Sequence, residues 1–149
     1  MKSSGYFLTG TDTDIGKTFV ACALLHAWRR KGLRVVGYKP VAAGAEKVNG
    51  ELVNDDARRL QAASSDGFTL AQINPVCLPE AVAPHIAAAH AGREIEFDLI
   101  LSGYRYLATD SDRVLVEGVG GFRVPLGDAH DTADMALALN LPVILVVGI

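Results

Sequence analysis

Residues 10–18 combine glycines, a lysine and a hydroxyl group in an order that suits phosphate binding. They read GTDTDIGKT and connect a predicted strand to a predicted helix. Glycines allow the backbone to fold around a phosphate with its N–H groups pointing inward, and the start of a helix adds partial positive charge. We expect Lys17 to reach the β- and γ-phosphates of a nucleotide and the Thr18 hydroxyl to bind Mg²⁺. The alternative, an ordinary glycine-rich turn, is disfavoured because strand, Gly-Lys-Thr and helix follow in the required order.

The same loop departs from the usual phosphate-binding pattern. Five residues separate Gly10 from Gly16, one more than the common spacing. Two acids, Asp12 and Asp14, lie inside a segment that is built to bind anions. Carboxylates in such a place are costly unless they meet a metal ion or an amine. The loop therefore indicates a positively charged substrate.

Two further charged residues end predicted strands. Glu117 follows an apolar run and precedes glycines, so its carboxylate could bind Mg²⁺ directly or through water beside a closely approaching ligand. Lys39 ends another strand, and ligands of open α/β sheets lie beyond the carboxyl ends of strands. It could stabilise negative charge on phosphoryl or carboxylate oxygens in the same crevice. A solvated strand end is the weaker alternative for Glu117, whereas a surface lysine stays open as the alternative for Lys39.

The other polar and sulfur-bearing residues that stand out have structural interpretations. Asn54 or Asp55 would cap a helix, and His85 follows a proline at another helix start. Asp128, His130 and Asp131 are expected to form a turn followed by a helix cap. Cys22 and Cys77 are expected to have no chemical role.

Hydrophobic periodicity predicts an α/β domain. Apolar runs predict strands at residues 6–9, 34–39, 113–117 and 142–148, and helical spacing predicts helices at residues 17–31, 54–63, 97–109 and 132–139. The helix between the first two strands makes a βαβ unit, so these strands should be parallel. Apart from one helix, residues 41–84 are expected to be a long connection. Residues 1–149 should form a single domain, and because no helix follows the last strand we expect it to be C-terminally incomplete.

Composition narrows the class of protein. Half of the residues are hydrophobic and 21% are charged, which excludes intrinsic disorder. The net charge of −3 predicts no cationic surface for nucleic acid. The longest apolar run, residues 141–149, is too short to span a membrane, and the first residues lack the apolar stretch of a signal peptide. With only two cysteines, the chain is expected in the reducing cytoplasm.

Taken together, the motifs resemble those of the dethiobiotin synthetase family. The resemblance rests on residues 9–18, 37–41, 54–57, 84–85 and 116–121, which follow in the family's order and at similar spacing across nearly the whole chain. It implies a P-loop NTPase-like fold: a mostly parallel sheet with helices on both faces, a three-layer sandwich. It also implies an ATP-dependent ligase of biotin biosynthesis that closes diaminopelargonic acid and CO₂ to dethiobiotin, through a carbamate and a carbamic–phosphoric anhydride. The family is homodimeric and uses Mg²⁺.

The resemblance also implies roles for individual residues. Lys39, Lys17 and Thr13 would act in catalysis, and Thr18, Asp56 and Glu117 would hold Mg²⁺. The residues implied to contact the nucleotide and its metal are Asp14, Ile15, Gly16, Lys17, Thr18, Phe19, Asp56, Glu117, Gly118, Val119 and Gly120. Those implied to contact the substrate are Thr13, Asp14, Lys39, Ala43 and Gly118.

The sequence departs from this family at Asp14, where glutamate is frequent, and at Ala43, where a hydroxyl residue is familiar. Any contact from Asp14 to the substrate amine would be one methylene shorter. The hydrogen bond missing at Ala43 costs about 1 kcal/mol, so substrate binding should be weakened rather than abolished. The chain also ends early relative to the family. The competing interpretations are a related P-loop amidoligase, a ParA/MinD-like ATPase switch, and a truncated homologue that binds nucleotide without ligase activity.

Overall fold

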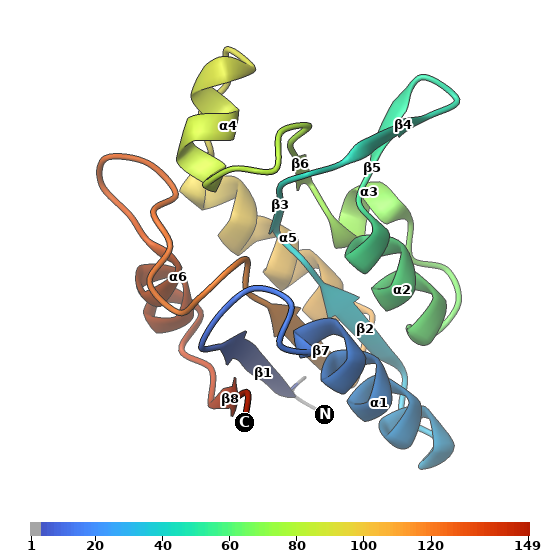
Figure 1. The fold of residues 1–149 in the computed structure, drawn as a ribbon. Coiled ribbons are helices and arrows are strands. Elements are labelled where there is room, and N and C mark those ends of the chain that lie inside the picture. Colours follow the sequence, from blue (N-terminus) through green and yellow to red (C-terminus); the bar gives the residue numbers. More distant parts are fainter. Residues whose placement is uncertain (1–3) are drawn as a thin grey trace.

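The computed structural model describes residues 4–149; residues 1–3, the first of those considered for a signal peptide, lie outside the described part. Its helices are α1 (Lys17–Arg30), α2 (Asp55–Ala63), α3 (Leu70–Ile73), α4 (Pro84–His90), α5 (Phe97–Thr109) and α6 (Thr132–Leu139). Its strands are β1 (Ser4–Gly10), β2 (Val35–Tyr38), β3 (Val41–Ala42), β4 (Glu46–Val48), β5 (Glu51–Val53), β6 (Val76–Cys77), β7 (Arg113–Glu117) and β8 (Val143–Val146). Figure 1 shows the main sheet crossing the centre of the molecule between helices.

The main sheet has four parallel strands in the order β2-β7-β1-β8. The predicted βαβ unit is therefore correct in direction, but β7 lies between its two strands and pairs with both. The carboxyl ends of β1, β2 and β7 meet at one edge, with Leu8 opposite Glu117 and Tyr38 opposite Val116. This edge brings the 10–18 loop, Lys39 and Glu117 together although they are far apart in sequence.

Helices cover both faces of this sheet, as predicted. Neighbouring residues of β2 show it: a side chain at Gly37 would meet Leu25 of α1 and Leu60 of α2, whereas the Tyr38 hydroxyl donates a hydrogen bond to the Ile100 carbonyl of α5, 2.9 Å away. Since successive side chains of a strand point to opposite faces, α1 and α2 cover one face and α5 the other. The result is the predicted three-layer α/β fold.

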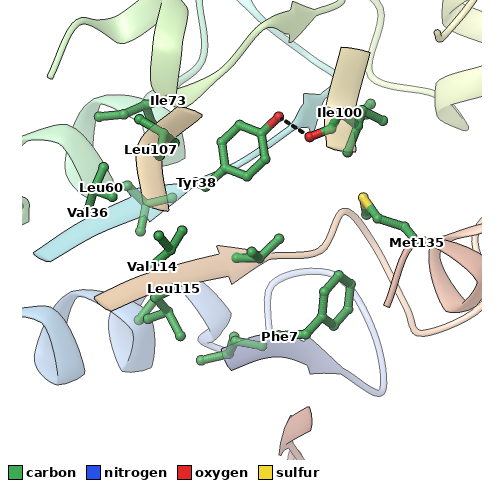
Figure 2. Packing of buried hydrophobic residues seen from close by; sticks show 14 of the residues in the cluster. Phe7, Val36, Tyr38, Leu60, Ile73, Ile100, Leu107, Val114, Leu115 and Met135 are labelled. Carbon is green, nitrogen blue, oxygen red and sulfur yellow. Dashed lines mark hydrogen bonds between the residues drawn. The ribbon is translucent and has the colours of Figure 1, made fainter. Parts of the chain in front are cut away.

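The hydrophobic core lies between these layers. Phe7 on β1 and Tyr38 on β2 are fully buried, as are Leu107 on α5 and Met135 on α6. Figure 2 shows Phe7, Tyr38 and Met135 within this core, with the hydrogen bond from Tyr38 to Ile100 as a dashed line. Burial raises the pKa of the Tyr38 phenol far above its ordinary value, so Tyr38 stays a neutral donor to α5. This packing holds β2 and its carboxyl end, where Lys39 follows, in a fixed position.

The prediction of an unstructured connection within residues 41–84 is wrong in part. The short strands β3 and β6 pair in parallel, and β4 and β5 form an antiparallel hairpin that projects from the body in Figure 1. These strands have two or three residues each, too few for an alternating pattern to be seen in the sequence. The short helix α3 is set by a capping box, with Thr69 and Gln72 bonding each other's backbone N–H groups. The predicted helix start at Pro84 is confirmed by α4.

None of the helices within residues 4–149 combines the length and apolar character needed to cross a membrane.

Candidate functional site

The loop between β1 and α1 has the backbone geometry of a phosphate-binding turn. A Cβ atom at Gly10 would lie 2.5 Å from Ile15 Cδ1 and 3.0 Å from Lys17 Cγ, so glycine is needed where the loop folds back over its own start. Gly16 has a φ of 101°, a left-handed conformation that glycine adopts without steric cost. Among the described residues, no side chain caps the N-terminus of α1. Its first N–H groups are therefore available to an anion.

The ammonium of Lys17 lies inside this loop and bridges two segments. It donates to the carbonyl of Asp12 at 2.8 Å and to the carbonyl of Gly120, in the loop after β7, at 2.7 Å. An ammonium has three donors, so one remains for a phosphate oxygen. Burial, with a further contribution from the nearby Lys39 charge, lowers the pKa of Lys17. An anion bound beside it would relieve this unfavourable burial.

A second group of side chains centres on Glu117. Its Oε1 accepts hydrogen bonds from the Thr18 hydroxyl at 2.8 Å and from Lys39 Nζ at 3.0 Å. Lys39 Nζ also lies 3.6 Å from Oδ2 of Asp56, at the start of α2. Four parts of the chain, the first turns of α1 and α2 and the ends of β2 and β7, thus converge on one cluster of charged and polar side chains.

The donor set of this cluster fits a magnesium ion. Oε2 of Glu117 is buried and has no hydrogen-bond partner among the described residues, although buried carboxylate oxygens are normally satisfied. The Thr18 hydroxyl donates its proton to Glu117, which leaves its lone pairs free, and Asp56 adds a second carboxylate. Mg²⁺ prefers such hard oxygen ligands and usually keeps several waters. The two protein carboxylates and the hydroxyl therefore supply the type of ligand atom that Mg²⁺ requires.

A cavity of about 280 Å³ opens beside these groups. It is lined by most of the predicted site residues, namely Thr13, Asp14, Gly16, Lys17, Thr18, Phe19, Lys39, Ala43, Asp56, Glu117, Val119 and Gly120. Two predicted residues do not line it. Ile15 packs near Gly10 and Gly148, and the Gly118 N–H donates to the Leu8 carbonyl and continues the pairing of β7 with β1.

Two residues that line the cavity were missed by the sequence analysis as site residues. Asn54 precedes α2, and Arg59 lies on α2 three residues after Asp56. The helical spacing of Asp56 and Arg59 was the available signal, because residues three apart share one helix face. Without the tertiary structure, nothing indicated that this face of α2 turns toward the loop.

The structure decides between several alternatives. Lys39 is 4% exposed, so its interpretation as a surface lysine is wrong, and Glu117 at 1% is not solvated. The Asn54 side chain accepts from the Ala57 N–H and is the predicted cap, which leaves Asp56 in the first helical turn. Asp131 caps α6 as predicted, with its pKa lowered by hydrogen bonding to the Asp134 N–H. Cys22 and Cys77 are free thiols with pKa values raised by burial, in line with packing rather than reactivity.

Comparison with known proteins places the chain in a family. A family profile described as an AAA domain matches residues 4–149. The chain belongs to the AAA domain family. Membership agrees with the P-loop NTPase-like fold that the strand, loop and helix of residues 4–30 display.

Among curated relatives, this AAA domain is 62% identical over 143 residues to the ATP-dependent dethiobiotin synthetase BioD of Aromatoleum aromaticum. The match covers 96% of the chain and 64% of the relative, so the chain spans less than two thirds of the relative's length. Among solved structures it is similar to the signal recognition particle receptor FtsY of Elizabethkingia anophelis in complex with GDP. That likeness has a TM-score of 0.39 and 17% identity, and it covers 94% of the chain and 34% of the other protein.

Proposed function

We propose that the chain carries the ATP-binding and catalytic part of a dethiobiotin synthetase. The reaction is the ATP-dependent closure of diaminopelargonic acid and CO₂ to dethiobiotin, through a carbamate and a carbamic–phosphoric anhydride. The observation that carries the proposal is the cluster of Lys17, Thr18, Lys39, Asp56 and Glu117 around one cavity. The 62% identity to a protein named as an ATP-dependent dethiobiotin synthetase supports this reaction over the amidoligase and ATPase-switch alternatives.

In this proposal the two lysines have separate tasks. Lys17 has one free donor inside the loop and would bind a phosphate oxygen of ATP. Lys39 uses one donor on Glu117, so its remaining donors could hold the carbamate and phosphoryl oxygens in line. Fixed positive charge in a buried site stabilises developing negative charge without reorganisation of the protein.

Thr18, Asp56 and Glu117 would hold the magnesium ion. When bound, Mg²⁺ neutralises negative charge on the phosphoryl oxygens. The carboxylate of Glu117 is oriented for this task because Thr18 and Lys39 both bind its Oε1, which leaves Oε2 as the free ligand atom.

The organic substrate would contact Thr13, Asp14 and Ala43, which all line the cavity. The Asp14 carboxylate would face an amine of the substrate, which would explain why an anion-binding loop contains acidic residues. Ile15, Phe19, Val119 and Gly120 would contribute backbone or apolar contacts to the nucleotide. Gly118, whose N–H is bonded to Leu8, would contribute through its carbonyl or through the close approach that a glycine allows.

The proposal also includes the assembly and location of the protein. It would be a homodimer in the cytoplasm that acts on small molecules rather than on nucleic acid or membrane.

The test is phosphate release from ATP with and without diaminopelargonic acid and bicarbonate, together with detection of dethiobiotin by mass spectrometry. The proposal expects release that requires both additions and yields the product. The same assay is run on a longer chain that covers the relative's full length, because the present chain spans only 64% of it. The absence of phosphate release and of dethiobiotin with both chains would contradict the proposal.

The division of labour between the lysines is tested in the same assay. Lys39→Ala is expected to retain ATP binding largely and to slow product formation, since its donors act on the reacting oxygens. The measurement is made at a temperature where the variant is folded. Unchanged turnover would remove Lys39 from the catalytic group.

A further inference from the structure

Arg59 is a cationic residue of the cavity that neither the motifs nor the resemblance assigned. It lies on α2, three residues after Asp56, and the two side chains share a helix face that turns toward the cavity. Among the described residues that line this cavity it is the only arginine. Its side chain is 64% exposed, whereas Lys17 and Lys39 are both buried.

Among the residues that the structure describes, the guanidinium of Arg59 has only one weakly held partner. It pairs with Asp55 at 2.8 Å, four residues earlier on the same helix, and the Asp55 side chain is 69% exposed. Exposed pairs of this kind contribute little free energy, so a stronger partner can replace Asp55. The two lysines differ, because Lys17 is bonded to backbone carbonyls and Lys39 to a buried carboxylate.

A contact between helices places Arg59 near the start of α1. Helix α2 packs against α1, and Cys22 lies four residues after Thr18 on α1. Burial raises the pKa of Cys22, and the charge of Arg59 opposes that rise. Arg59 lines the same cavity as Thr18 and Phe19 in the first turn of α1, so its side chain borders this cavity from the α2 side.

We propose that Arg59 binds the phosphate chain of the nucleotide from the α2 side of the cavity and exchanges Asp55 for phosphate oxygens as it does so. The planar guanidinium can donate two parallel hydrogen bonds to phosphate oxygens, which a lysine cannot do. Asp55 then keeps the side chain near the cavity while no nucleotide is bound. The inference rests on the proposed function, because it requires that the cavity bind a nucleoside triphosphate.

The test is isothermal titration calorimetry of the full chain with MgATP and with magnesium tripolyphosphate. Arg59→Ala is expected to raise the dissociation constant of both about tenfold, the loss of one charged hydrogen-bonding contact. Arg59→Lys, which keeps the charge but loses the planar pair of N–H donors, should raise the dissociation constant about threefold. Arg58→Ala is the matched control, since Arg58 is an exposed neighbour on α2 that does not line this cavity; a change below about twofold is expected.

Asp55→Asn separates phosphate binding from a structural role of the ion pair. If Arg59 acts on phosphate, freeing it should leave MgATP affinity unchanged or slightly tighter. If the pair serves only helix α2, Asp55→Asn should weaken binding as much as Arg59→Ala does, which would overturn the inference.

Other outcomes are equally decisive. Weaker binding of MgATP but not of tripolyphosphate by Arg59→Ala would move Arg59 away from the phosphate chain and overturn it. An unchanged MgATP constant with a raised half-saturating concentration of diaminopelargonic acid would assign Arg59 to the organic substrate instead. Equal binding by wild type and Arg59→Ala refutes the role of Arg59 alone, whereas a wild-type chain that binds no MgATP refutes the proposed function as well.

Discussion

Replacing Lys39 by methionine should destabilise the folded chain, because it removes one member of a buried ion pair. The side chains of Lys39 and Glu117 are 5% and 1% exposed, and Lys39 Nζ lies 3.0 Å from Glu117 Oε1. Methionine keeps a long unbranched stem and removes the charge. Glu117 would then retain the Thr18 hydroxyl but lose its contacting cation. Removing one partner of a buried ion pair costs about 3–5 kcal/mol of stability. We expect the lower end of this range because the positive charge of Lys17 also interacts with Glu117.

The partner substitution should cost less. Glu117→Gln leaves Lys39 with Asp56, 3.6 Å away and 42% exposed, so an expected cost of about 1–2 kcal/mol corresponds to a lost charged hydrogen bond. The double variant Lys39→Met, Glu117→Gln has neither buried charge and should cost about 2 kcal/mol. The two single costs add to about 4–5 kcal/mol, which predicts a coupling free energy of about 2–3 kcal/mol.

The assay is guanidinium unfolding followed by tryptophan fluorescence. Trp28 is the only tryptophan of the sequence, is 9% exposed and stacks on Tyr6, so its emission reports the packing of α1 on the sheet. Lys47→Met in the exposed strand β4 is the control and should change stability by less than about 0.5 kcal/mol. A Lys39→Met cost below about 1 kcal/mol, or single costs that simply add, would refute the reasoning that this pair is energetically coupled.

Three further predictions concern the phosphate-binding loop. Lys17→Ala should abolish measurable MgATP binding, and wild-type turnover by this variant would contradict the assignment of the loop. Because burial and the Lys39 charge lower the pKa of Lys17 below the usual 10.5, Lys17 loses its charge at a lower pH than an ordinary lysine. MgATP affinity should therefore fall with rising pH in a window below pH 10.5, and Lys17→Arg, whose guanidinium stays charged, should flatten that decline. Gly10→Ala should cost about 1–3 kcal/mol and weaken MgATP binding, because the added methyl meets Ile15 and the stem of Lys17. Gly127→Ala, where a Cβ meets open space, is its control, and equal effects at both positions would show that the loop tolerates the methyl group.

Much of the secondary structure was determined by local sequence. The predicted bounds of α5, β7 and α6 agree with the structure, since each combines a clear apolar pattern with residues that start or stop it. For α6, the Asp131 carboxylate caps the first turn and Asn140 ends the helix in a left-handed conformation. These signals act within a few residues and are readable without any knowledge of the fold.

Part of the candidate site was determined in the same way. Glycine at positions 10 and 16, followed by Lys17 and Thr18, is a local pattern whose chemistry depends on one turn of backbone. The sequence alone therefore predicted an anion-binding loop at the start of a helix. Glu117 could be proposed because it ends an apolar strand, which is also a local observation.

The tertiary structure decided which distant residues complete the site. The sequence left Lys39 between a surface position and a catalytic one, and favoured a capping role at the start of α2. Insertion of β7 between β1 and β2 brings Glu117 to within 3.0 Å of Lys39, and Asn54 takes the cap so that Asp56 can face the same ammonium. The orientation of the α2 face that carries Arg59 was likewise fixed by tertiary packing, since α2 packs against α1, β2 and α3. Strand order and helix rotation depend on how complementary apolar faces bury one another across the whole chain, and no window of neighbouring residues contains that information.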